Sequence, residues 1–228
     1  MTTRKGIILS ITLILVILFI DQVSKIWVKT HMQQGEEILI LGQQWAKIHF
    51  IENEGMAFGL KFGGETGKLA LSLFRIIAIG FLGFLLYTMI KAQEKVGLII
   101  SFSLILAGAI GNMLDSAFYG LIFSNSPYHG GLAELFPEDG GYAPFLMGRV
   151  VDMFYFPMWN SQFPEWFPIW GGEDFEFFRP VFNIADASIS TGVIALLIWQ
   201  KKFFPKEDET TPKAVETGAV VDDKAQVL

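Results

Sequence analysis

Two aspartates lie where apolar stretches meet polar ones, and together they could activate a water molecule. Asp152 ends the run GRVVD (148–152), and Asp186 ends the run FNIAD (182–186). Two carboxyl groups in contact in apolar surroundings cannot both ionise easily, so they share one proton. One acid then acts as a base on water while the other donates to the carbonyl oxygen or the leaving nitrogen of a peptide bond. The pair therefore predicts aspartic-type hydrolysis.

The same residues also have a purely structural interpretation. Asn183 followed by Asp186 is a sound helix start, with Asn183 as the N-cap and Asp186 at the third helical position, where its charge favours the helix dipole. Asp152 could cap a loop. On the residues alone, catalysis and capping both stay open.

The composition places the two acids in a membrane protein. The chain has 228 residues, of which 52% are hydrophobic and only 18% are charged, with a mean hydropathy of +0.44. A soluble domain of this size exposes more charge. The net charge of −6 argues against nucleic acid as a partner. The chain lacks cysteine, which excludes thiol nucleophiles and zinc–thiolate sites, and its three histidines show no metal-ligand spacing, so we expect no metal site.

Four apolar segments predict four membrane helices, at residues 6–29, 69–90, 96–114 and 184–199. At 1.5 Å per residue the second spans about 33 Å, enough to cross the hydrocarbon core, and it carries one charge, Arg75. The first segment follows Arg4 and Lys5 and is similar to a signal peptide. No small-x-small cleavage site follows it, so we expect it to remain as a helix.

The segments outside these helices predict a small sheet and long loops. Residues 36–41 and 47–51 are rich in branched and aromatic side chains, as strands are. From 116 to 182, recurring glycine and proline and then many aromatic residues predict irregular outer loops. We thus expect an all-α membrane protein with four transmembrane helices, a small extracytoplasmic β-sheet and long aromatic-rich outer loops. Residues 1–204 would be one domain, with outer loops 31–68 and 116–182, and 205–228 a disordered cytoplasmic tail.

The distribution of basic residues predicts the orientation. Those at the expected inner ends of the helices are Arg4, Lys5, Lys91, Lys95, Lys201, Lys202 and Lys206. Residues 112–182 hold two arginines against nine acids. The positive-inside rule then puts both termini in the cytoplasm. The outer face would gather seven polar residues from five separate stretches: Asp21, Asn53, Asn112, Asp115, Asp152, Asn183 and Asp186.

Two of these stretches have plainer interpretations of their own. Asp21 and Lys25 are four residues apart and share a helix face, as a simple helix-end ion pair would. Asn112 and Asp115 follow Gly108 on one face, which fits close helix packing and an end cap. Both interpretations remain open beside a role in a site.

Taken in chain order, the motifs resemble one family, the lipoprotein signal peptidases, which are the type II signal peptidases of bacteria. The resemblance covers residues 21 to 199. The matching motifs are Asp21-x-x-x-Lys25, Asn53-x-Gly55-x-Ala57-Phe58-Gly59, Gly108-Ala109-x-Gly111-Asn112-x-x-Asp115, Val150-Val151-Asp152 and Phe182-Asn183-x-Ala185-Asp186. Each is short, but five in this order are specific.

The resemblance implies an aspartic peptidase of the bacterial cytoplasmic (inner) membrane, with Asp152 and Asp186 as the catalytic pair at the outer face. The substrate would be a prolipoprotein whose cysteine carries diacylglycerol, cut just before that cysteine. No cofactor and no nucleic acid are expected; membrane lipids are, and so is a monomer. The residues that would bind substrate or support the site are Asp21, Lys25, Asn53, Gly55, Ala57, Gly108, Asn112, Asp115, Asn183 and Ala185. Of these, Gly55, Ala57 and Gly108 would line the cleft.

The sequence departs from the family pattern in two ways. The residue after Asp115 is usually arginine in this family, and here it is Ser116. Arg149 and Arg179 are candidates to supply the missing cation. The stretches from Asp115 to Asp152 and from Asp152 to Asp186 are also longer than usual, which predicts a larger outer lid.

Two other functions fit acids in a membrane protein. A small proton-coupled transporter would place them near the bilayer centre, in repeated halves. Here they lie at helix ends and the halves are unlike. The other alternative is a non-catalytic scaffold that presents the aromatic loop to a partner.

Overall fold

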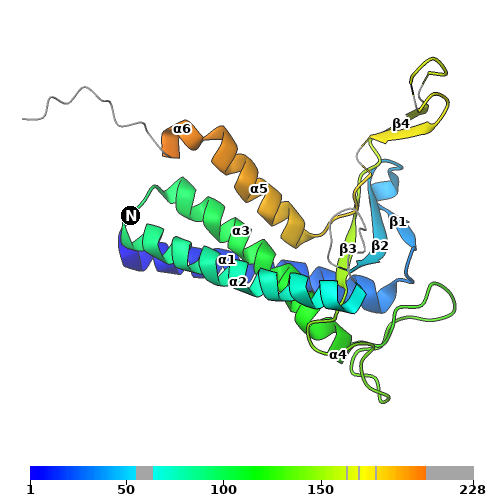
Figure 1. The fold of residues 1–228 in the computed structure, drawn as a ribbon, viewed down its shortest axis with the longest axis horizontal. Coiled ribbons are helices and arrows are strands. Elements are labelled where there is room, and N and C mark those ends of the chain that lie inside the picture. Colours follow the sequence, from blue (N-terminus) through cyan, green and yellow to red (C-terminus); the bar gives the residue numbers. More distant parts are fainter. Residues whose placement is uncertain (55–63, 163, 169, 178, 204–228) are drawn as a thin grey trace, which may run out of the picture.

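A computed structural model describes residues 1–54, 64–162, 164–168, 170–177 and 179–203. Its main elements are three long apolar helices, α1 (Thr3–His31), α2 (Gly64–Lys91) and α3 (Val96–Leu114). Each is long and apolar enough to cross a membrane, as predicted. A shorter apolar helix, α5 (Ile184–Ile198), packs along α3 and is followed by α6 (Gln200–Phe203). The first residues, the α2–α3 turn and α6 lie at one end of the bundle, and both sheets lie at the other (Figure 1).

α5 has 15 residues, about 22 Å at 1.5 Å per residue. A helix that crosses the hydrocarbon core needs about 20 residues. The described residues thus hold three helices of spanning length and one shorter apolar helix beside them.

The third apolar helix extends further than predicted. After Leu114 the chain continues through a π-helical turn, η3 (Asp115–Tyr119), into the short helix α4 (Gly120–Ile122). The expectation of loop from residue 116 was therefore wrong for these residues. Asp115 looked like a helix end because a charge inside an apolar helix is costly. It is tolerated here because its carboxylate pairs with the buried Lys25.

A three-stranded antiparallel sheet, in the order β1-β2-β3, stands at the C-terminal end of α1 (Figure 1). β1 (Glu37–Leu39) and β2 (Lys47–Asn53) fall where strands were predicted, joined through a 3₁₀ turn, η1 (Ile40–Gly42). β3 (Val150–Tyr155) lies in the region predicted as loop, and so does the separate hairpin of β4 (Trp159–Gln162) and β5 (Asp174–Phe177). The prediction of loop was therefore wrong for these three strands. For β3 the pairing partner, β2, lies about a hundred residues earlier, so nothing local indicates the pairing.

A small apolar core joins the sheet to the helices. Its fully or almost fully buried members come from α1, β2, η3, β3 and the residue after α4: Val28, Met32, Phe50, Tyr119, Phe123, Val151 and Met153. β3 contributes one core residue on each side of Asp152, namely Val151 and Met153, so packing fixes the strand on both sides of that acid.

One short bridge ties β3 to the start of α5. The backbone N–H of Phe154 donates to the carbonyl of Phe182 at 2.7 Å, and the N–H of Phe182 donates back at 3.0 Å. Phe182 directly precedes Asn183, so this pairing holds the beginning of α5 beside Asp152.

Candidate active site

The start of α5 is capped as the structural interpretation predicted. The side-chain Oδ1 of Asn183 accepts from the N–H of Asp186 at 2.9 Å, and Oδ2 of Asp186 accepts from the N–H of Asn183 at 3.3 Å. This reciprocal capping box fixes the Asp186 carboxylate, because one of its oxygens is held by the backbone. Its other oxygen accepts from Nδ2 of Asn112 at 2.7 Å. Capping and a site role are thus compatible.

The Asn183 amide links this helix start to the other acid. Its Nδ2 lies 2.8 Å from Oδ1 of Asp152, 3.0 Å from Oδ1 of Asn112 and 3.2 Å from the carbonyl of Val151. The side chain is fully buried. One asparagine therefore contacts both carboxyl groups, that of Asp152 through its side-chain amide and that of Asp186 through its backbone N–H.

Asp152 lies in β3, opposite Ile51 of β2, and is only 5% exposed. Its Oδ2 accepts from Nδ2 of Asn53 at 3.3 Å. Burial, and next the negative charge of Asp186, raise the pKa of Asp152 to about 7, against the lowering effect of the Asn53 hydrogen bond. A substantial fraction of Asp152 is therefore protonated at neutral pH, as an acid that must donate a proton requires.

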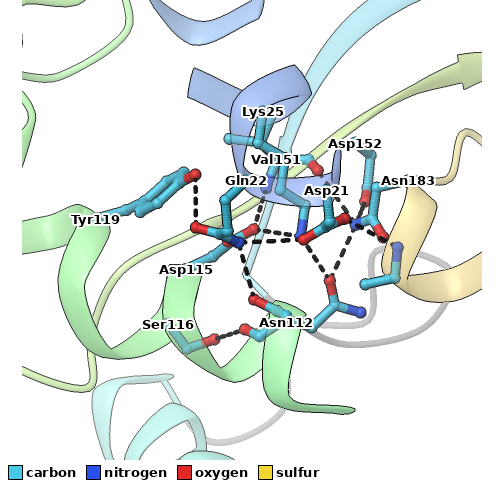
Figure 2. Close-up of polar contacts among 12 residues, drawn as sticks. Asp21, Gln22, Lys25, Asn112, Asp115, Ser116, Tyr119, Val151, Asp152 and Asn183 are labelled. Carbon is cyan, nitrogen blue, oxygen red and sulfur yellow. Dashed lines mark hydrogen bonds and ion pairs between the residues drawn. The ribbon is translucent and has the colours of Figure 1, made fainter. Parts of the chain in front are cut away.

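A buried lysine fixes the orientation of Asn112. Nζ of Lys25 donates to Oδ1 of Asn112 at 3.0 Å and pairs with Asp21 and Asp115, each at 2.9 Å (Figure 2). A lysine can only donate, so the oxygen of the Asn112 amide faces Lys25. The amide nitrogen is thereby turned towards Asp186, which it contacts.

The carboxylates of Asp21 and Asp115 also hold backbone groups of the two elements that carry the acids. Oδ1 of Asp21 accepts from the N–H of Ala185 at 2.9 Å, and Oδ2 of Asp115 accepts from the N–H of Val151 at 3.2 Å. The predicted helix-end ion pair of Asp21 and Lys25 is present. It also positions α5 directly and, through Asp115, β3.

Three residues of this cluster were not predicted. Nε2 of Gln22 donates to Asp21 at 3.1 Å and to Asp115 at 2.9 Å, and the hydroxyl of Tyr119 donates to Oε1 of Gln22 at 3.2 Å (Figure 2). The polar pair formed by Gln22 and Asp21 within an apolar helix was a usable signal. Nothing in the sequence singled out Tyr119.

The third missed residue is Arg75 of α2, whose NH1 donates to Oγ of Ser116 at 3.1 Å. We expected Arg149 or Arg179 to replace the family arginine at 116. Arg149 instead pairs with Glu52 of β2 at 2.9 Å. It also lies 3.6 Å from Glu54, which follows β2. The usable signal was that Arg75 is the one charge within residues 69–90.

The structure shows where one of the three small residues predicted to line the cleft lies. Gly108 is at the contact between α3 and α5, where an added Cβ would lie 2.2 Å from the carbonyl oxygen of Ala185. Its small size lets the two helices approach each other. Gly55 and Ala57 lie outside the described residues.

Among the described residues, no group of three or more histidine or acidic side chains is arranged to hold a metal ion. The polar cluster instead consists of carboxyl groups held by amide, ammonium and backbone N–H donors. Such a set can hold one proton on a pair of acids and orient a water molecule, which is chemistry that hydrolyses a peptide bond.

Fold and site together define a polytopic membrane protein with two acids at one end of its helices, of which Asp152 is buried and Asp186 is partly buried. The family model described as signal peptidase (SPase) II matches residues 13–202. The chain therefore belongs to the signal peptidase II family, as its motifs predicted, and is a peptidase.

Relatives and solved structures agree with this assignment. A lipoprotein signal peptidase of Porphyromonas gingivalis is 54% identical over 187 residues, covering 82% of this chain and 80% of the relative. A lipoprotein signal peptidase of Amoebophilus asiaticus is 38% identical over 186 residues, which cover 80% of this chain and 73% of the relative. Two solved structures described as bacterial membrane enzymes share the fold. The first is 24% identical, has a TM-score of 0.54, and the match covers 89% of this chain and 94% of the solved one. The second is 26% identical, has a TM-score of 0.55, and the match covers 85% of this chain and 92% of the solved one.

Proposed function

We propose that the chain is an aspartic endopeptidase that removes the signal peptide from diacylglyceryl-modified prolipoproteins by cutting just before the lipidated cysteine. Family membership supports the removal of signal peptides from lipoproteins. The observation that carries the aspartic mechanism is the double contact of Asn183, which reaches Asp152 through its amide and Asp186 through the capping box. Asp152 and Asp186 would be the catalytic residues.

The proposed reaction uses one water and one proton shared by the pair. Asp186, as carboxylate, takes a proton from the water as its oxygen attacks the scissile carbonyl carbon. Protonated Asp152 donates to the leaving nitrogen as the carbon–nitrogen bond breaks. The proton that Asp186 took from water then passes to Asp152, which restores the pair, and the product acid gives its own proton to the freed amine. The pKa of Asp152, raised to about 7, supports its role as the proton donor.

The other residues of the cluster have proposed supporting roles. Asn53, Asn112 and Asn183 would orient the two acids and the water. Asp21, Lys25, Asp115 and Ala185 would hold α1, α3, β3 and α5 in register. Gly55 and Ala57, which lie outside the described residues, are proposed to contact the substrate near its cysteine.

The proposed setting is the bacterial cytoplasmic membrane, with α5 as a fourth span, both termini in the cytoplasm and the site at the outer face. Residues 1–204 would form the peptidase domain and 205–228 a cytoplasmic tail. Basic residues at the end of the bundle away from the sheets support this orientation. The lipid tails and the apolar signal helix would enter from the bilayer, while the bond to be cut lies at the water boundary. A monomer suffices, since all proposed catalytic groups come from one chain.

The test is cleavage of a purified precursor lipoprotein, with and without its diacylglyceryl group, in detergent or lipid. Asp152→Asn and Asp186→Asn should each lower kcat by at least about a thousandfold, because each leaves one acid without its partner. Asp139→Asn, at an exposed acid of the outer segment, is the matched control and should cut like the wild type. Near-normal turnover in either site variant would overturn the two-aspartate mechanism, and equal cutting of the unlipidated precursor would overturn the substrate class.

A further inference from the structure

Arg75 is a charged residue in the middle of an otherwise apolar membrane helix, and a charge in that position needs a reason. Residues 69–90 hold no other ionised group. Charged residues in membrane helices are costly and mark functional positions when they face the interior of a bundle. Arg75 is half-buried, and its guanidinium reaches across to Ser116 at the end of α3.

Ser116 connects Arg75 to the frame of the carboxyl pair. Its hydroxyl accepts from Arg75 at 3.1 Å and donates to the backbone carbonyl of Asn112, also at 3.1 Å. Asn112 in turn donates its amide to Asp186 at 2.7 Å. The guanidinium is therefore anchored one helical turn from the residue that holds Asp186.

The charge balance of the cluster calls for a second cation. The charged side chains that face the pair come from α1, α2, η3, β3 and α5: Asp21 and Lys25, Arg75, Asp115, Asp152 and Asp186. With one proton on the pair, three negative charges would face Lys25 alone. Arg75 attracts Asp186 most strongly, then Asp115, then Asp152. Among the acids of this set, Asp186 is therefore the one with which Arg75 interacts most.

We propose that Arg75, anchored on Ser116, is a positioning residue that keeps the negative charge of the pair on Asp186 and the proton on Asp152. It thereby replaces the cation expected directly after Asp115. The small serine at 116 fits this role, because it is 2% exposed and a longer side chain would occupy the space into which the guanidinium reaches. This inference rests on the proposed function, since it assigns a task within that reaction.

The sign of the effect follows from electrostatics. A nearby positive charge favours the ionised form of a carboxyl group. Without it, both ionisations of the pair occur at higher pH, so the bell-shaped profile of kcat/KM against pH moves up. Loss of fold alone would lower the height of the profile without moving it.

The experiment measures kcat/KM from pH 5 to pH 9 on the lipidated precursor. Arg75→Met should move the whole profile up by about one pH unit, so that kcat/KM on the acid side of the profile falls by up to about tenfold. Adding Ser116→Arg to Arg75→Met should restore the wild-type position, because the charge returns from α3. Lys91→Met, which removes an exposed charge from the far end of α2, is the control and should leave the profile in place.

An unmoved profile in Arg75→Met, whatever its height, overturns the proposal, and so does a displaced profile that Ser116→Arg fails to restore. If Arg75→Met yields no folded enzyme, Ser116→Ala decides, since it keeps the charge and removes the oxygen that anchors it. A smaller upward displacement supports the proposal, and an unmoved profile contradicts it. Full activity of Asp152→Asn or Asp186→Asn would instead defeat the proposed function, so the two failures are distinguishable.

Discussion

Asp152 is an acid held by neutral partners. Its carboxyl group receives hydrogen bonds from the amides of Asn53 and Asn183, and the ammonium group of Lys25 is occupied by Asp21, Asp115 and Asn112. Asp152 therefore lacks a direct salt bridge among its described contacts, and burial dominates its pKa. This division leaves one acid of the cluster able to hold a proton near pH 7.

A dependence of stability on pH follows from that division. Because folding raises the pKa of Asp152 from 3.8 to about 7, the folded state binds more protons than the unfolded state between these values. Stability from this group is complete below about pH 4 and is lost as the pH rises through about 7. Asp152→Asn stays neutral, so at pH 8 its free energy of unfolding should exceed that of the wild type by up to about 4 kcal/mol. It should therefore also unfold at a higher temperature.

Thermal unfolding in detergent at pH 5 and pH 8 checks this. The advantage of Asp152→Asn should shrink at pH 5, where the wild-type acid is also largely neutral. Asp139→Asn, at an exposed acid, should show neither effect. An Asp152→Asn variant that loses stability equally at both pH values would contradict the assigned cause.

The sequence identified most of the polar cluster but not how its members pair. The acids Asp152 and Asp186 and the three asparagines that contact them could be picked out because polar residues at the ends of apolar segments are costly and few. Gln22 and Arg75 carried a signal as polar residues within apolar segments, but their partners lie on other elements and could not be predicted. Tyr119 carried no signal at all, because its contact with Gln22 depends on how the helices rotate against each other.

The long helices could be predicted because a membrane requires about 20 apolar residues in a row. β3 could not, because its partner β2 lies about a hundred residues earlier and nothing local shows that pairing. The helical continuation of α3 through η3 and α4 was also missed, since the charge of Asp115 looks like a terminus until Lys25 of another helix is beside it. Hydropathy thus predicts spans, while contacts between distant elements decide the rest.

The packing of α3 against α5 depends on glycine. An added Cβ at Gly108 would lie 2.2 Å from the Ala185 carbonyl oxygen, and one at Gly192 would lie 2.6 Å from that of Ser101. Backbone oxygens cannot move aside as side chains do. The approach of these helices therefore sets how close Asn112 lies to Asp186.

Gly108→Ala should separate α3 from α5, at a cost of about 1–3 kcal/mol of stability, and should lower kcat because the Asn112–Asp186 hydrogen bond lengthens. Gly83→Ala in α2 is the matched control, since an added Cβ there meets nothing within 4 Å. It should leave kcat unchanged and be neutral or slightly stabilising. Thermal unfolding and precursor cleavage of both variants test this, and a fully active, stable Gly108→Ala would contradict the assigned packing role.

The molecule has two unlike ends. One holds the first residues, the α2–α3 turn and α6, and the other holds the two sheets and α4 (Figure 1). The proposed site lies towards the second end, where β3 meets α5. A membrane enzyme of this form would meet its substrate at one surface and would present a separate face to the opposite compartment.

This arrangement predicts which side reagents reach. The chain contains no cysteine, so an introduced cysteine is its sole thiol. Asp139→Cys, in the exposed outer segment, should react with a membrane-impermeant maleimide in intact spheroplasts, whereas Gln93→Cys, in the α2–α3 turn, should react only after lysis. Reversed labelling would invert the proposed orientation, and activity of both variants would verify that each still folds.

The bridge between Phe154 and Phe182 bears on the biogenesis of the enzyme. Asp152 is synthesised with β3, but Asp186 arrives with α5, the last apolar helix that the structure describes, and the bridge brings the two together. A chain that has inserted α1 to α3 holds one acid of the pair and cannot hydrolyse anything by the proposed route. On the proposed mechanism, the peptidase would therefore stay inactive during synthesis until α5 has docked on α3, and its activity would begin only when its assembly is complete.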